Sequence, residues 1–176
     1  MFNLVIVIIT IALTAALALA SINYLPWWTK SASDVDTVAR TSMNQLERAY
    51  DVTVRAANGT APAPTGDADG GLMSQFGPVL RFTPVAPAGF SWRYGRYSGT
   101  DPRYANLDYF CLTPTATGKG ASEGVYRGFQ RARNLYSREQ VILAASCGAT
   151  ADGAKPTMYP APVSVTMFVL YTPTGA

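Results

Sequence analysis

Histidine is absent from all 176 residues, and this absence excludes several chemistries at once. Imidazole is the side chain that enzymes use most often for general acid–base catalysis, and the serine triad depends on it. Without histidine, the two cysteines, Cys111 and Cys147, would leave a tetrahedral zinc site half empty. We therefore expect neither a histidine-dependent enzyme nor a structural zinc site.

Charge is absent from the first 28 positions, and Lys30 is the first charged residue. This run is longer than the roughly 20 apolar residues that cross a bilayer. No basic residue precedes it, which argues against an ordinary secretory signal peptide. Tyr24, Trp27 and Trp28 stand just before Lys30, an arrangement typical of a membrane interface. Residues 1–28 are therefore predicted to be a retained apolar helix, and the remaining residues, about 145, suffice for one domain.

Carboxylates are few, and no two of them are held at a separation that catalysis would use. Residues 67–71 weakly resemble a calcium loop but lack its later bidentate glutamate. No glycine-rich phosphate loop precedes a lysine-bearing helix. The remaining acids are predicted to be solvated loop residues, including Asp67, Asp69, Asp101, Asp108 and Glu123. We thus predict no catalytic, cofactor-binding or metal-binding residue, and not an enzyme.

Basic residues are spread over the chain, and the net charge is only +3. Nucleic-acid binding is therefore not indicated, although residues 92–104 alternate arginines with aromatic rings. Such a stretch could stack single-stranded bases. The alternative, which we favour, is a strand whose rings pack against a neighbouring element.

Two cysteines downstream of a membrane-directed segment favour a disulfide between Cys111 and Cys147 in an oxidising compartment. A pair of buried free thiols is the alternative.

Local patterns predict one long helix followed by strands. Pro26 is expected to kink or break the helix, and Ser33 with Asp36 resembles a capping box at which it restarts. Apolar residues then recur every three or four positions as far as Asn58 and Gly59, which predicts an amphipathic helix over residues 29–58. A loop is expected over residues 59–77. Strands are predicted at residues 79–83, 90–97, 107–113, 140–147 and 163–172. Residues 125–135 are either a short helix or an arginine-bearing loop.

The order of these parts resembles that of a type IV pilin, of the type IVb or minor kind, or of a related type II secretion pseudopilin. The resemblance rests on the uncharged N-terminal helix with Pro26, the amphipathic continuation, the Gly/Pro-rich loop, and strands with two cysteines near the C-terminus. It implies an α+β fold in which a long N-terminal helix packs on an antiparallel sheet of about four strands. Residues 1–28 would be the transmembrane and filament-core helix, residues 29–58 its continuation, and residues 59–176 a head whose C-terminal region the disulfide closes.

The resemblance implies that the chain is a structural subunit of an extracellular filament and that it binds no cofactor. Met1 would be the processed and methylated terminus. The partners would be other copies of the chain, other pilins, the bacterial inner membrane before assembly, and the assembly platform of the pilus machinery. The expected assembly interface comprises Phe2, Leu4, Val5, Ile8, Ile9, Leu13, Ala16, Leu17 and Pro26.

One residue departs from the family pattern, because Val5 occupies the position where most such pilins carry glutamate. Either Met1 is not the processed terminus, or the subunit assembles without the contact between this acid and the terminal amine of the neighbouring subunit. In the second case apolar packing would have to set the stagger between copies. A second hypothesis is a single-span envelope protein whose surface domain binds a ligand or partner.

Overall fold

The fold of this chain is α+β, as expected, and a computed structural model describes it for residues 11, 14 and 27–170. Within these residues three helices accompany one four-stranded antiparallel sheet, and no helix is both long and apolar enough to span a membrane. The elements in chain order are α2 (Trp27–Ala56), α3 (Leu72–Leu80), β1 (Phe90–Arg96), β2 (Asp108–Pro114), α4 (Glu123–Arg133), β3 (Val141–Ala144) and β4 (Ser164–Phe168).

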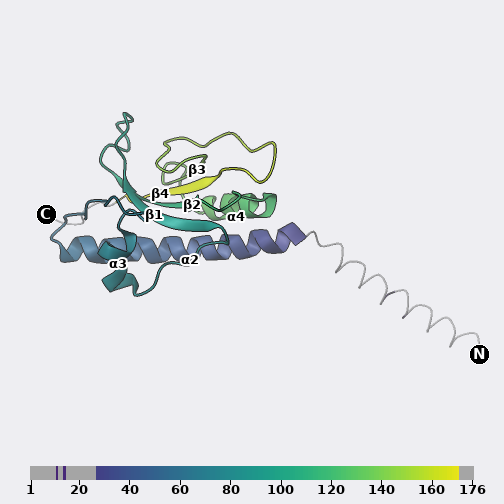
Figure 1. The fold of residues 1–176 in the computed structure, drawn as a ribbon, viewed down its shortest axis with the longest axis horizontal. Helices are drawn as coiled ribbons and strands as arrows, with labels where there is room; N and C mark the ends of the chain where they lie inside the picture. Colours follow the sequence, from purple (N-terminus) through teal and green to yellow (C-terminus); the bar gives the residue numbers. More distant parts are fainter. Residues whose placement is uncertain (1–10, 12–13, 15–26, 171–176) are drawn as a thin grey trace, which may run out of the picture.

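Helix α2 runs along the sheet and buries one stripe of side chains against it (Figure 1). The stripe has the spacing of three and four residues that the sequence predicts for residues 29–58, and its buried apolar members are Ala32, Val35, Ala39, Met43, Leu46, Ala49, Tyr50 and Val54. The helix ends where expected. Asn58 has a φ of 54°, and the Gly59 N–H donates to the Val54 carbonyl at 2.8 Å. This left-handed turn satisfies carbonyls that the last turn of a helix leaves without partners.

The predicted restart at Ser33 is wrong, because α2 runs through that position without interruption. The Ser33 carbonyl accepts a bond from the Thr37 hydroxyl at 3.0 Å, and Asp36 pairs with Arg40 one turn later. A capping side chain needs free backbone N–H groups, and these exist only at the first turn of a helix. The same residue types inside a helix make contacts between successive turns instead.

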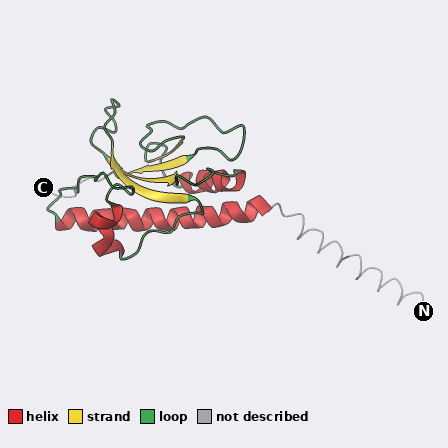
Figure 2. Ribbon diagram, in the orientation of Figure 1, coloured by secondary structure: helices red, strands yellow, loops and turns green. Residues whose placement is uncertain are grey.

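The sheet has the strand order β1-β2-β4-β3, and every neighbouring pair is antiparallel. Figure 2 shows its strands lying along one side of α2. Strands β1 and β2 match their predicted ranges to within one residue at each end. Phe90, Trp92 and Tyr94 all point into the core as predicted, while Arg93 is exposed. The rings of this stretch therefore pack inside the protein.

The strand predicted at residues 79–83 is wrong, because Val79 and Leu80 end helix α3. The Asp69 carboxylate accepts bonds from the backbone N–H groups of Gly71 and Met73, at 2.9 and 3.1 Å, and so starts the helix. The loop predicted over residues 59–77 is correspondingly shorter. Helix α3 lies across α2 near the C-terminal end of α2 (Figure 1).

Of residues 125–135, those as far as Arg133 belong to helix α4, and residues 134 and 135 form the turn that follows it. Ser122 caps α4 by accepting from the Val125 N–H, and Glu123 pairs with Arg127 one turn later. The two C-terminal strands are shorter than predicted. Strand β3 ends at Ala144, three residues before Cys147, and β4 ends at Phe168. The last predicted strand residues, 171 and 172, lie outside the described part of the chain.

Helix α4 packs closely against α2 at Gly128. A Cβ atom there would lie 2.7 Å from the Val35 Cβ and 2.8 Å from the Ala32 carbonyl oxygen. Real Cβ atoms do not come this close, so only glycine fits between the two helices as they are packed.

Gly128→Ala should therefore lower the free energy of unfolding by about 1–2 kcal/mol, because the strain of overpacking exceeds the gain in helix propensity. Gly66→Ala is the matched control, since a Cβ atom there would meet nothing within 4 Å. Urea unfolding followed by circular dichroism measures both variants. An unchanged midpoint for Gly128→Ala would show that the helices can separate at no cost.

Candidate functional site

The residues expected to form the assembly interface lie outside the described part of the chain, and so does Met1. They are Phe2, Leu4, Val5, Ile8, Ile9, Leu13, Ala16, Leu17 and Pro26. Their assignment stays a prediction. The described head carries three further candidates: the disulfide, a buried ionic cluster, and hollows on its surface.

The predicted disulfide between Cys111 and Cys147 is present, with the two Cα atoms 5.7 Å apart. Cys111 lies in the central strand β2, and Cys147 lies in the turn that follows the edge strand β3. The bridge therefore folds the chain after β3 back across β4. Gly148 adds to this contact, because its N–H donates to the Thr166 hydroxyl of β4 at 3.0 Å.

The bridge lies on the face of the sheet that points away from α2. Phe110 and Leu112 belong to the core beneath the sheet, whereas Cys111 between them points to the opposite side. A second apolar cluster of Tyr104, Ile142 and Phe168 covers that opposite side, and Ala149 packs against it. The disulfide thus holds a loop over a face that would otherwise be exposed and apolar.

Cys147→Ser should reduce the free energy of unfolding by about 2–5 kcal/mol, because the bridge closes a loop between positions 36 residues apart. Hydrogen exchange should accelerate in residues 145–153 and in β4. Ser146→Ala, at the exposed neighbouring position, is the control. Exchange rates that match those of the unmodified protein would contradict a structural role for the bridge.

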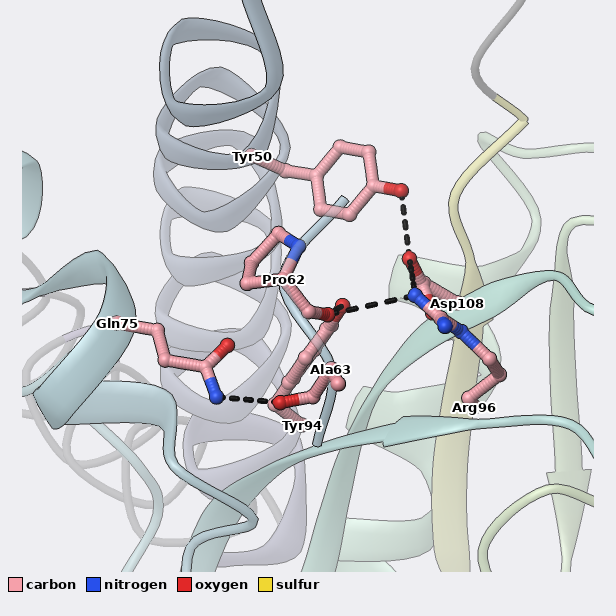
Figure 3. A network of polar contacts seen from close by, with 7 residues as sticks. All are labelled: Tyr50, Pro62, Ala63, Gln75, Tyr94, Arg96 and Asp108. Atoms are coloured by element: carbon pink, nitrogen blue, oxygen red, sulfur yellow. Dashed lines mark hydrogen bonds and ion pairs between the residues drawn. The ribbon is translucent and has the colours of Figure 1, made fainter. Parts of the chain in front are cut away.

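A buried ionic cluster centres on Asp108, the first residue of β2, whose side chain is only 2% exposed (Figure 3). Arg96 of β1 donates from Nε to Oδ1 at 2.6 Å and from Nη2 to Oδ2 at 3.2 Å. The Tyr50 hydroxyl of α2 donates to Oδ2 at 2.7 Å. Because a buried carboxylate is costly unless paired, these contacts fix α2, β1 and β2 to one point.

The same cluster also holds the loop that follows α2. The Pro62 carbonyl accepts from the Tyr94 hydroxyl at 2.7 Å and from Arg96, and the next carbonyl, that of Ala63, accepts from Gln75 of α3 (Figure 3). Burial raises the pKa of Tyr94 well above its usual range, and the nearby Asp108 charge adds to the shift. The bond to Asp108 raises the pKa of Arg96 further. Tyr94 therefore stays neutral and Arg96 stays charged at neutral pH.

Asp108 was expected to be a solvated loop acid, and that expectation is wrong. A signal for its burial was nevertheless present in the sequence. Arg96 stands at the end of one predicted strand and Asp108 near the start of the next, so a hairpin would place the two opposite each other, and the register does pair them. A pair of opposite charges at matching ends of two strands is what such an ion pair requires.

Arg96→Ala should destabilise the protein by about 2–3 kcal/mol, because it leaves a buried carboxylate without its charged partner. The control is Arg55→Ala, which removes an exposed pair with Asp51 on α2 and should cost less than about 0.5 kcal/mol. Thermal unfolding of both variants at pH 7 gives the comparison. Equal losses of stability in the Arg96→Ala and Arg55→Ala variants would contradict a structural role for the cluster.

Hollows are present on the surface of the described part of the chain, and two of them are of similar size. One, of about 400 Å³, lies between α2 and the turn after α4, where Tyr136 donates to the Asn44 side chain at 3.1 Å. The other, of about 350 Å³, lies between α4 and the connection from β3 to β4. A smaller apolar hollow of about 110 Å³ shares Tyr126, Leu143 and Gly153 with it. These two adjoining hollows join polar and apolar lining in one place.

No group of three or more His, Cys, Asp or Glu side chains comes together as a metal site within the described residues. Asp69 acts as a helix cap, and Asp67 accepts a bond from Thr65 at 2.7 Å. The carboxylates of Asp67 and Asp69 are therefore engaged in local hydrogen bonds with neighbouring residues.

Comparison with known proteins returned no family model, no curated protein and no solved structure that matches this chain.

Proposed function

We propose that this chain is a structural subunit of an extracellular, type IV pilus-like filament. The observation that carries the proposal is that the charge-free residues 1–28 lead directly into α2 in the sequence. The apolar side chains of α2 pack in the core of a folded domain that a disulfide closes. A helix of 30 residues is roughly 45 Å long. Residues 1–28 can thus lie in the membrane and then in the filament core, while α2 carries the folded domain.

The composition of residues 1–28 supports assembly among copies of this segment. Its small residues would allow helices to approach closely, and its aliphatic residues would fill the space between them; the small ones are Ala12, Ala15, Ala16, Ala18 and Ala20. With Val5 in place of an acid, no ion pair sets the stagger in this region, so shape and apolar packing set it.

The head supports a location outside the cytoplasm. A disulfide persists in an oxidising compartment, and this one holds a loop that covers an apolar face of the sheet. In the proposed sequence of events, the subunit waits in the bacterial inner membrane, the assembly platform extracts it, and it joins other copies and other pilins in the filament.

The proposal predicts that Ile8→Asp and Leu13→Asp each abolish filaments recovered by shearing, because a charge among packed apolar helices has no partner. Lys119→Glu is the control, since it changes the charge of an exposed head residue. Immunoblots of the membrane fraction show whether each variant is made and inserted. A normal yield of filaments from either the Ile8→Asp or the Leu13→Asp variant would contradict the proposal. A membrane-inserted wild-type protein that never enters a polymer would favour a single-span envelope protein instead.

A further inference from the structure

We propose that the two adjoining hollows beside α4 bind a small sugar that carries an N-acetyl group. This inference goes beyond filament formation, because the binding would occur in a single head. The hollows lie between α4 and the long connection from β3 to β4, which passes beside α4 in Figure 1. Their volumes, about 350 and 110 Å³, together fall in the range of small-molecule sites.

The larger hollow offers fixed donors and acceptors. Arg133 of α4 donates from Nε to the Val141 carbonyl at 3.3 Å and pairs through Nη2 with Asp152. The other oxygen of Asp152 accepts from the Leu143 N–H at 3.1 Å. Arg133 is only 14% exposed, whereas Asp152 is 40% exposed and is held by its bonds to Arg133 and to the Leu143 N–H before a ligand arrives. Pre-organised groups of this kind lose little entropy on binding.

Further polar groups surround this pair. The Gln130 amide donates to the Tyr126 hydroxyl at 3.2 Å and keeps its carbonyl oxygen for a ligand. Asn134 and Lys155 are exposed at the edge of the same hollow. Burial raises the pKa of Tyr126, so its hydroxyl stays protonated. Alternating donors and acceptors on planar side chains suit the neighbouring hydroxyl groups of a sugar ring.

The smaller hollow is lined by apolar groups of small size, among them Ala144, Ala154, Pro162 and Val163. At about 110 Å³ it is smaller than the roughly 150 Å³ cavity that holds benzene, so it has room for a methyl or acetyl group and not for a ring. Because it shares Tyr126, Leu143 and Gly153 with the polar hollow, one ligand can reach both. An acetamido sugar has hydroxyls for the first hollow and a methyl group for the second.

A peptide end fits less well than a sugar. Arg133 is already paired with Asp152, so a terminal carboxylate would find only the exposed Lys155 at the edge of the hollow as a charged partner. A neutral ring needs no cation, and Lys155 can donate to its hydroxyls.

The test titrates the full-length protein in detergent with N-acetylglucosamine and, separately, with glucose. Saturation-transfer NMR follows the ring protons of both sugars and the acetyl methyl of the first. We expect saturable binding, and affinity for glucose that is weaker by about ten-fold, because glucose has no group for the apolar hollow. Equal affinity for the two sugars, or no saturable binding of N-acetylglucosamine, would overturn the proposal. N-acetylalanine amide binding as tightly as the sugar would overturn it as well, in favour of a peptide site.

Two variants locate the site. Gly153→Ala adds a methyl group where the hollows meet, and its Cβ atom would lie 3.4 Å from the Ala144 Cα, an ordinary contact that the fold tolerates. We expect this variant to lose the preference for N-acetylglucosamine over glucose. Lys155→Ala should weaken both sugars, whereas Lys119→Ala, which lines neither hollow, should leave both affinities unchanged. Wild-type discrimination by Gly153→Ala, with its fold verified by circular dichroism, would show that the acetyl group lies elsewhere.

Discussion

Asp108 places a negative charge in the interior of the head, and the elements around it are arranged so that the charge is paired. Its partners come from a neighbouring strand, through Arg96, and from the long helix, through Tyr50. Arg96 extends the contact to the Pro62 carbonyl in the loop after α2. A buried ion pair contributes little net stability compared with apolar residues of the same size, but breaking it is costly. The cluster is therefore best understood as fixing the position of α2 on the sheet. For a subunit proposed to assemble through the segment preceding α2, that position decides where the head stands.

The sheet has two apolar faces, and each is covered in a different way. Helices α2 and α4 cover one face, and their close approach at Gly128 leaves no room for a side chain between them. Loops cover the other face, and the disulfide holds one of them in place. Phe168 of β4 packs with Ile142 of β3 on this second face, so β4 is buried on both faces and shows no clean alternation of polar and apolar residues. A disulfide lowers the conformational entropy of the unfolded chain and so stabilises a loop that has no regular backbone hydrogen bonds to keep it packed.

Much of the fold could be predicted from local patterns, and the errors have identifiable causes. The buried stripe of α2, its end at Asn58, strands β1 and β2 and the disulfide follow from periodicity, turn chemistry and cysteine usage. The error at Ser33 arose because a capping pattern was judged without knowing which backbone N–H groups are free. The error at residues 79–83 arose because so short an alternating run does not distinguish a strand from the end of a helix. Asp69 does cap a helix, whereas Ser33 lies inside one. The hollows beside α4 could not be predicted, because Arg133 and Asp152 meet only through tertiary packing.

The central claim is that residues 1–28 join copies of this chain while the heads face outward. An electron cryomicroscopy reconstruction of the native appendages, at a resolution that resolves side chains, tests it most directly. The account predicts a bundle of helices from residues 1–28 along the filament axis, continued by α2, with the disulfide-closed heads on the surface and apolar contacts alone near Val5. A filament whose axis is formed by another protein, or one in which this chain contributes only its head, would contradict the account.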